Sequence, residues 1–301
     1  MAAPGSKRWI VTAIPYAWML VFFLVPFLIV FKISFSSTEI AQPPYSPTFD
    51  LINDVLADTL EKIQALQFDN YKRLFTDSIY IESYLSSLWI ASTSTLMMLF
   101  LAYPIAYGMA RAPKSIRPTL VMMVILPFWT SFLIRIYAWI SILSEEGLLN
   151  SLLVNLGIIE EPMQILSTNT AVYIGILYSY LPFMVLPLYS ALEKMDDSLI
   201  EAAKDLGCTQ FQAFWRVTFP LSIPGVIAGC FLVFIPAVGE FVIPDLLGGS
   251  ETVMIGKTMW EEFFNNRDWP AASAVAVALL IVLMIPIMIF QSNEARQQEM
   301  R

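Results

Sequence analysis

The sequence predicts an all-α membrane protein with six transmembrane helices. Of its 301 residues, 57% are hydrophobic and only 14% are charged, whereas an ordinary soluble domain carries about 25% charged residues. Six apolar runs reach the roughly 20 residues that a helix needs to cross a bilayer core. None of them alternates in polarity as the strands of a membrane barrel do. The predicted spans are 9–31, 84–110, 119–143, 169–192, 222–247 and 271–290.

The first span is predicted to stay in place as an uncleaved anchor. Lys7 and Arg8 precede it, as basic residues precede the apolar core of a signal peptide. Its apolar run is about 23 residues, however, against the usual 7–15, and no A-x-A cleavage pattern follows. We therefore expect residues 1–31 to form a short tail and the first transmembrane helix.

The segment 32–83 is predicted to lie outside the membrane and to contain an amphipathic helix. Its apolar residues recur at helical spacing, which favours a helix packed on the protein or on the membrane surface. Docking of an external partner is the alternative. The residues that carry the pattern are Leu51, Ile52, Val55, Leu56, Leu60 and Ile63.

The remaining spans form a core transmembrane domain, 84–291, followed by a cytoplasmic tail, 292–301. Of the 17 Lys and Arg residues, Arg135 lies inside a span, ten lie on the side that holds both termini and six lie on the other side. The short loop 111–117 alone carries three of them and no acid. Because basic residues concentrate in cytoplasmic loops, we expect both termini in the cytoplasm and 32–83 outside.

Charge and composition exclude several functions. The net charge of −8 disfavours a nucleic-acid partner. The chain has no histidine, and Cys208 and Cys230 lie far from any cluster of possible ligands, so neither a metal site nor a disulfide framework is expected. No nucleophile–base pair is apparent, which makes a membrane enzyme the weakest interpretation.

The loop 193–221 between the fourth and fifth spans contains residues that typically begin and end two helices. Ser198 and Glu201 match a capping box, and Gly207 suits the left-handed residue that ends a helix. Thr209 is positioned to cap a second helix running to about 219, which Pro220 should stop. Several apolar side chains of this loop need the membrane surface or a protein partner: Phe211, Phe214, Trp215 and Phe219.

The same loop resembles the EAA loop of bacterial ABC-importer permeases. The resemblance rests on Glu201-Ala202-Ala203, Gly207, and Val217 with Phe219-Pro220, where the family usually has isoleucine and leucine in place of Val217 and Phe219. We call 193–221 the coupling loop. Longer stretches, 127–135, 181–189, 234–241 and 265–270, look like those of polyamine (putrescine/spermidine) importer permeases over nearly the whole chain after Pro15.

The resemblance implies the ABC type I importer permease architecture in a bacterial inner membrane. The chain would be one half of a heterodimeric channel, with an ATPase homodimer that carries ATP and Mg and an extracytoplasmic polyamine-binding protein as partners. The chain itself would be no enzyme and would hold no cofactor. The residues implied to couple it to the ATPase are Ser198, Glu201, Ala202, Ala203, Asp205, Gly207, Phe214 and Pro220.

Putrescine is the expected cargo, although a coupling loop does not encode its cargo. Permeases for ferric ion, thiamine or an anion are therefore alternatives, and a stand-alone secondary transporter is a more distant one. Gly256-Lys257-Thr258 imitates the end of a phosphate-binding P-loop, but Glu251 stands where that loop needs glycine. ATP must be bound by another chain.

Three charged residues, Arg135, Glu240 and Asp245, lie within predicted spans. Charges at bilayer depth are costly unless they are paired or face a wet cavity, which makes them candidates for a functional site. One hypothesis places Glu240 and Asp245 on a path for polyamines, with cation–π contacts from Trp129, Tyr137 and Tyr178. The alternative is a structural Arg135–Glu240 ion pair, and a solvated position for Asp245.

Two further patterns concern the packing of the spans. Prolines recur within them and should kink the helices. Gly225 and Gly229 give the fifth span a small-residue face for close contact with another helix, either within the chain or across a dimer interface.

Overall fold

The computed structural model describes residues 6–49 and 56–299, and side chains within 12–49, 58 and 60–288. Five helices are long and apolar enough to cross a membrane, or six if one bent helix pair is counted as a single span. This confirms the predicted all-α membrane fold. The strands among the described residues form one short antiparallel hairpin, β1 (Ser37–Thr38) and β2 (Tyr45–Ser46). The side chains of Lys7 and Arg8 lie outside the described set.

The chain divides into two compact units, Met1–Ile81 with Thr258–Arg301, and Glu82–Lys257. The N-terminal part of the chain therefore groups with its last helix.

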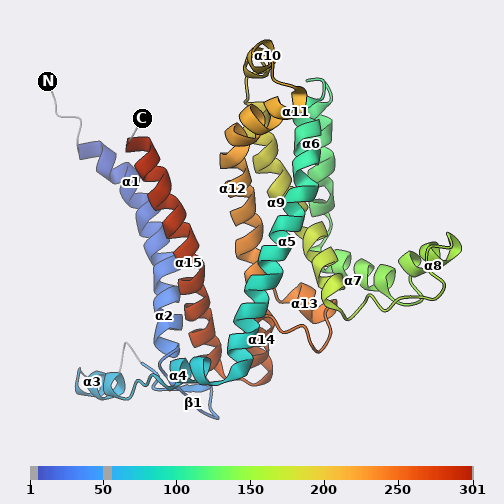
Figure 1. Cartoon of the computed structure of the whole chain (residues 1–301). Helices are drawn as coiled ribbons and strands as arrows, with labels where there is room; N and C mark the ends of the chain where they lie inside the picture. Colours follow the sequence, from blue (N-terminus) through green and yellow to red (C-terminus); the bar gives the residue numbers. More distant parts are fainter. Residues whose placement is uncertain (1–5, 50–55, 300–301) are drawn as a thin grey trace. The chain divides into compact units, whose positions relative to one another are not determined.

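The first unit is built around a pair of apolar helices. α1 (Ser6–Met19), a π-helical turn (Leu20–Leu24) and α2 (Val25–Ile33) form one continuous helix. α2 lies beside α15 (Trp269–Glu299), as Figure 1 shows in blue and red.

Shorter elements complete this unit. The π-helical η4 (Glu261–Asn265) and α4 (Asp69–Thr76) both pack against α15. The aromatic rings of Phe35, Phe68 and Tyr71 join the end of α2 to α4, with Phe35 5.1 Å from each of the other two ring centroids.

The predicted amphipathic helix of 32–83 is present in part. α3 (Leu56–Gln64) is helical, and the side chains of Leu60 and Ile63 are exposed on it. Leu51, Ile52 and Val55 lie outside the described residues, as does the side chain of Leu56.

The second unit is a helical bundle of α5 (Ser78–Arg111, from residue 82), α9 (Asn169–Glu193) and α12 (Phe219–Val238). Its core is formed by apolar side chains of all three helices, among them Met98, Ala102, Ala106, Met184, Leu188 and Val233. The helix α14 (Ile255–Trp260) begins in this unit.

The closest helix contact in the bundle depends on glycine. A Cβ atom at Gly225 would lie 2.6 Å from the Cβ of Ala191, and one at Gly229 would lie 2.7 Å from the sulfur of Met184. Both neighbours belong to α9. The predicted small-residue face is therefore confirmed, and its partner is a helix of the same chain.

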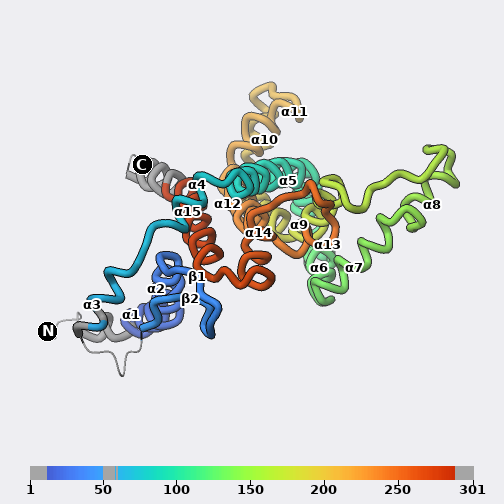
Figure 2. The backbone as a smooth tube through the Cα atoms, turned by 90° about the horizontal axis from the view of Figure 1, so that it is seen from below, coloured from blue at the N-terminus to red at the C-terminus, as the bar shows by residue number. Residues whose placement is uncertain are grey.

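The predicted span 119–143 is not one continuous helix. α6 (Arg117–Ile125) and a 3-10 turn (Leu126–Trp129) end at extended backbone, and α7 (Phe132–Leu143) and α8 (Leu148–Asn155) then run at 87° to them. Pro127, which cannot donate a helical hydrogen bond, stands where the α-helix gives way to the 3-10 turn, and the backbone becomes extended at Thr130. Figures 1 and 2 both show α8 projecting away from the bundle.

The predicted span 222–247 is displaced toward the coupling loop. α11 (Gln210–Ala213), a π-helical turn (Phe214–Thr218) and α12 form one continuous helix, Gln210–Val238, so the expected stop at Pro220 is wrong. Pro220 stands in the first turn of α12, where a missing N–H costs little, and the preceding π turn leaves room for its ring. The helix ends at Val238, and α13 (Val242–Leu246) follows after a break at Gly239–Phe241.

Candidate functional site

The coupling loop forms two helices that are joined at a glycine. α10 (Ser198–Asp205) is followed by Gly207 in the left-handed conformation, with φ +85°, as predicted. Thr209 caps α11, and Gln212 completes a capping box that the sequence analysis had not recognised.

The predicted Ser198–Glu201 capping box is absent from the described structure. The Ser198 amide donates instead to the Asp196 carboxylate, 3.0 Å away, and this bond lowers the pKa of Asp196 below its ordinary value of 3.8. Asp196, two positions before Ser198, is the better cap, because its carboxylate is a stronger hydrogen-bond acceptor than the Ser198 hydroxyl group.

Aromatic rings attach the coupling loop to α5. The Phe214 ring makes edge contacts with Tyr103 and Tyr107, with centroid separations of 5.6 Å and 5.9 Å. The Tyr103 hydroxyl also lies 2.9 Å from that of Ser222. Phe211 and Trp215 remain exposed, as expected for side chains that require an external partner.

Two ion pairs reinforce this attachment. Arg111, at the end of α5, pairs with Asp197 just before α10, and its guanidinium lies over the ring of Tyr107. Arg117, at the start of α6, pairs with Glu193 at 3.5 Å. Both arginines come from the short basic loop 111–117, so two of its three positive charges are used in contacts within the chain.

The predicted coupling residues differ in exposure. Ala203 is buried against the rest of the unit, and Phe214 is half-buried. The remaining ones are exposed, or half-buried at most: Ser198, Glu201, Ala202, Asp205, Gly207 and Pro220.

A cavity of about 450 Å³ lies between α7, α9 and the break after α12. Aromatic rings dominate its wall, and two charged side chains, Arg135 and Glu240, reach it. The other lining residues are Phe128, Phe132, Ser179, Tyr180, Phe183, Pro236, Gly239, Phe241 and Val242.

Glu240 is buried, with 7% of its surface exposed, and fully hydrogen-bonded. Its Oε1 accepts the backbone N–H groups of Phe241, Val242 and Ile243 at 3.2, 2.9 and 3.3 Å. Its Oε2 accepts the hydroxyl of Tyr180. The break after Val238 thus places the carboxylate at the start of α13, where unpaired N–H groups stabilise a negative charge.

The predicted Arg135–Glu240 ion pair is absent from this structure, in which both residues are described. Arg135 is 9% exposed, and its Nε and Nη1 have no hydrogen-bond partner. Its guanidinium lies over the rings of Phe128, Phe132 and Tyr178 at 5.0, 5.8 and 6.0 Å. The pairing prediction is wrong because the backbone and Tyr180 occupy the Glu240 carboxylate.

The other candidate path residues are dispersed. Trp129 and Tyr137 are exposed and do not line this cavity. Tyr178 packs edge-on against Trp139 at 5.4 Å and contributes to the surroundings of Arg135. Asp245 is about half-exposed and pairs with Lys257 at 3.7 Å.

Tyr180 is the functional candidate that the sequence analysis missed. A phenolic hydroxyl in the middle of an apolar span needs an acceptor, and that requirement was a usable signal. Its acceptor could not be identified in advance because Glu240 lies 60 residues away along the chain.

Gly256 supports the backbone that carries Glu240. A Cβ atom there would lie 2.5 Å from the Glu240 carbonyl oxygen, and the adjacent Ile255 amide donates to the Ser87 hydroxyl at 2.7 Å. The glycine of the misleading Gly256-Lys257-Thr258 sequence thus permits a close backbone approach.

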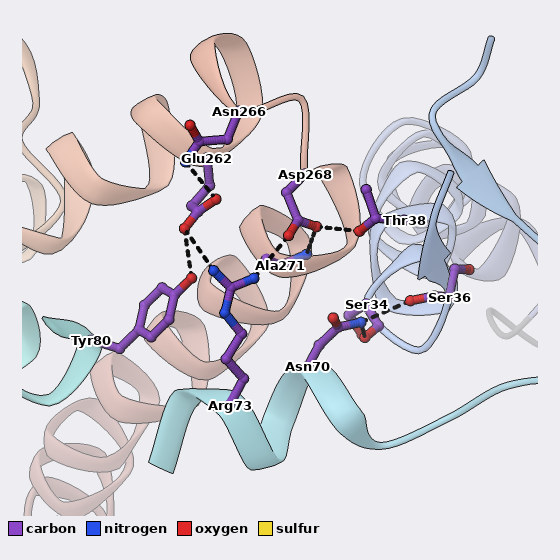
Figure 3. Close-up of polar contacts among 10 residues, drawn as sticks. All are labelled: Ser34, Ser36, Thr38, Asn70, Arg73, Tyr80, Glu262, Asn266, Asp268 and Ala271. Atoms are coloured by element: carbon purple, nitrogen blue, oxygen red, sulfur yellow. Dashed lines mark hydrogen bonds and ion pairs between the residues drawn. The ribbon is translucent and has the colours of Figure 1, made fainter. Parts of the chain in front are cut away.

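A second polar cluster lies within the first unit, as Figure 3 shows. Arg73 lies between two carboxylates, 2.9 Å from Asp268 and 3.6 Å from Glu262. Tyr80 and Asn266 donate to Glu262, and Thr38 donates to Asp268. Burial lowers the pKa of Arg73, but its acidic neighbours outweigh burial and raise that pKa overall. The cluster connects α4, η4 and β1.

A family model supplies the decisive comparison. The model described as "Binding-protein-dependent transport system inner membrane component" matches residues 5–296. The chain belongs to this family. It is therefore an inner-membrane permease component of an ABC transporter and not itself an enzyme.

Named relatives agree with this assignment. The chain is 39% identical over 281 residues to the spermidine/putrescine transport system permease protein PotB of Haemophilus influenzae, covering 93% of this chain and 92% of that protein. It is 46% identical over 222 residues to the permease of the same name from Escherichia coli K12, covering 74% and 80%.

A solved structure agrees in fold. A bacterial ABC transporter involved in the import of alginate matches with a TM-score of 0.69 at 17% identity, over 97% of this chain and 96% of that chain. At this identity the likeness supports the importer permease fold alone.

Proposed function

We propose that the chain is a translocating subunit of an ATP-driven polyamine importer, with putrescine as its cargo. The observation that carries the proposal is the buried Glu240 carboxylate on an aromatic-lined cavity. The names of the relatives, spermidine/putrescine permeases at 39% and 46% identity, support this class of cargo.

The chemistry of the cavity suits an extended cation that carries ammonium groups. The Glu240 carboxylate can replace part of the hydration that an ammonium loses, and the rings of Phe128, Tyr180 and Phe183 offer faces for cation–π contacts and for the methylene chain. The hydrogen bonds to Glu240 keep the carboxylate in place while the cargo passes.

The coupling loop is the proposed contact with a partner ATPase. We assign this role to its exposed residues, Ser198, Glu201, Ala202, Asp205, Gly207 and Pro220, with Ala203 and Phe214 holding the loop to the bundle. ATP and Mg then belong to an ATPase homodimer. A second permease subunit completes the channel, and an extracytoplasmic binding protein delivers the cargo. Both termini are assigned to the cytoplasm.

Reconstitution tests the proposal. The chain is placed in proteoliposomes with its second permease subunit, ATPase and binding protein, and ATP hydrolysis is measured with putrescine, spermidine or sulfate. We expect stimulation by polyamine-loaded binding protein and none by sulfate. No stimulation by any polyamine in an assembled complex would reject the assigned cargo.

Glu240→Gln tests the cavity. The variant keeps an oxygen acceptor but loses the negative charge. A hydrogen bond from an ammonium to a neutral amide is weaker than one to a carboxylate, and we expect this difference to reduce uptake about 10- to 100-fold. Tyr180→Phe is the matched control, because it removes one hydrogen bond to the same carboxylate and keeps the charge. If the Glu240→Gln complex takes up putrescine as fast as the native complex, the proposal that Glu240 contacts the cargo is rejected.

A further inference from the structure

The Arg135 guanidinium has no acceptor for two of its donor groups. A guanidinium carries five N–H donors, yet Nε and Nη1 of Arg135 are buried and lack hydrogen bonds. Its guanidinium lies over the rings of Phe128, Phe132 and Tyr178, which come from the 3-10 turn, α7 and α9; they attract the charge but accept no strong hydrogen bond. Among the described residues no acceptor is bonded to these two nitrogens, and an anionic group is the partner that would best satisfy them.

Glu240 is the acidic residue among those that line the cavity, and its carboxylate is held by hydrogen bonds of its own. Three backbone amides hold its Oε1 in place, and the Tyr180 hydroxyl uses one of the two acceptor positions of Oε2, so only an incoming group that reaches Oε2 where it stands can still bind. Moving Glu240 to Arg135 would leave those amides at the start of α13 as donors without an acceptor, which is unfavourable for buried groups.

The depth of the cavity disfavours a lipid phosphate. Tyr180, which lines the same cavity, is 11 residues from Asn169 at one end of α9 and 13 from Glu193 at the other. At the helical rise this places it about 16 Å and 20 Å from the two ends. An arginine at this level is too deep to reach headgroups if α9 crosses the bilayer.

The α6–α7 segment next to Arg135 presents an apolar surface. Met123, Trp129 and Ile134 are exposed there, with Trp129 at 71%. An apolar helix of another membrane chain can pack on this surface, and a carboxylate on that helix would enter the cavity that Arg135 lines.

We infer that the Arg135 cavity receives a carboxylate from the second permease subunit. This inference rests on the proposed function, which supplies that subunit. Arg135 and Glu240 together contribute no net charge, so a dication would meet no attraction in this chain's half of the path alone. A partner carboxylate on Arg135 removes the repulsion between its guanidinium and the cargo and leaves Glu240 to bind ammonium.

Carbodiimide cross-linking tests the inference. Arg135→Lys retains the positive charge and supplies an amine, which dicyclohexylcarbodiimide joins to an adjacent carboxylate as an amide. The variant is expressed with the second permease subunit in membranes, treated, and analysed by denaturing gel and peptide mass spectrometry. We expect a covalent species at the summed mass of both permeases, linked from position 135 to an Asp or Glu of the partner. Native Arg135 cannot form this amide and is the blank.

Arg117→Lys is the matched reactivity control, because Arg117 pairs with Glu193 of its own chain. It should give an intrachain link and no covalent dimer. A link from position 135 to Glu240, or no link in an active, assembled complex, would overturn the inference. If no second permease co-purifies with the native chain, the half-channel proposal itself fails.

A charge reversal gives a second measurement in case the lysine variant misfolds. Arg135→Glu should lose co-purification with the second permease more than Arg135→Gln does, in variants whose isolated chains are shown by thermal unfolding to be folded. Equal co-purification of both variants and the native chain would reject the inferred contact.

Discussion

Reversing the charge of Arg111 should uncouple ATP hydrolysis from transport. Arg111 connects the end of α5 to Asp197 at the start of α10, and so joins the bundle to the proposed ATPase contact. Arg111→Glu places two like charges at this junction. Asp197→Arg does the same from the other side. The double variant restores an ion pair with its direction reversed.

The expected size of the effect follows from exposure. The Arg111 side chain is 28% exposed and that of Asp197 is 72% exposed, so the pair belongs to the solvent-screened class that contributes about 0.2–1 kcal/mol. Repulsion between like charges costs a similar amount. The total change is therefore about 0.4–2 kcal/mol, or about a 2- to 30-fold change in the population of the attached loop.

The assay is the ratio of putrescine transported to ATP hydrolysed in proteoliposomes. Each single reversal should lower this ratio, while basal ATP hydrolysis persists because the ATPase subunits are unchanged. The double reversal should recover most of the ratio. Added salt should reduce the difference between the native and single-variant complexes, since exposed charges are screened.

Recovery by the double variant separates an ionic connection from general damage to the fold. The reasoning is refuted if both single variants keep the native ratio in assembled complexes, or if the double variant is no better than either single one. Phe214→Leu is a useful comparison, because it loosens the aromatic attachment to Tyr103 and Tyr107 and no second charge can rescue it.

Three further changes have defined outcomes. Gly256→Ala should displace the Glu240 backbone and lower polyamine uptake, whereas Gly108→Ala, whose new methyl group meets no atom within 4 Å, should not. Arg73→Met removes the cation between two carboxylates and should lower the thermal unfolding temperature, with a cost of about 1–3 kcal/mol because the arginine is half-exposed. The pKa of Asp196 is lowered in the folded state, so its carboxylate stabilises α10 fully above pH 3.8 and loses this effect as the pH falls through the folded-state pKa. Asp196→Ala should abolish this acid-dependent loss of helix. Hydrogen exchange of the α10 amides measures it.

The sequence was sufficient for the fold class because hydropathy over about 20 residues is a strong local signal. It also located Gly207, the start of α11 at Thr209, and the glycines that let α12 approach α9. Each of these features depends on a single residue type that favours one conformation or permits one close contact. Such a residue can be recognised in the sequence directly.

The breaks within spans were harder to predict. Many prolines occur in the apolar runs, and only some interrupt the helix: Pro127 lies at the bend after α6, whereas Pro182 and Pro187 lie inside a continuous α9. Whether a proline ends a helix depends on the surrounding packing, which a local pattern does not contain.

The hydrogen bonds of the cavity could not be predicted from the sequence either, because they too depend on how distant segments pack. Glu240 and Arg135 stood out in the sequence as charges within apolar spans, and both line one cavity. Their expected pairing was wrong, because the break after Val238 supplied three backbone donors to Glu240. The location of that break therefore left Nε and Nη1 of Arg135 without the acceptor that Glu240 was expected to supply.

The continuous helix Gln210–Val238 has a mechanical consequence. One end lies in the coupling loop and the other adjoins the break that carries Glu240, and the 29 residues between them form a rod of about 43 Å. If the rod pivots at its loop end, a tilt of about 10° moves the far end by about 7 Å, more than one helical turn. A small rotation at the proposed ATPase contact would thereby move the Glu240 end by a distance comparable with the size of the proposed ammonium site, without any helix unfolding.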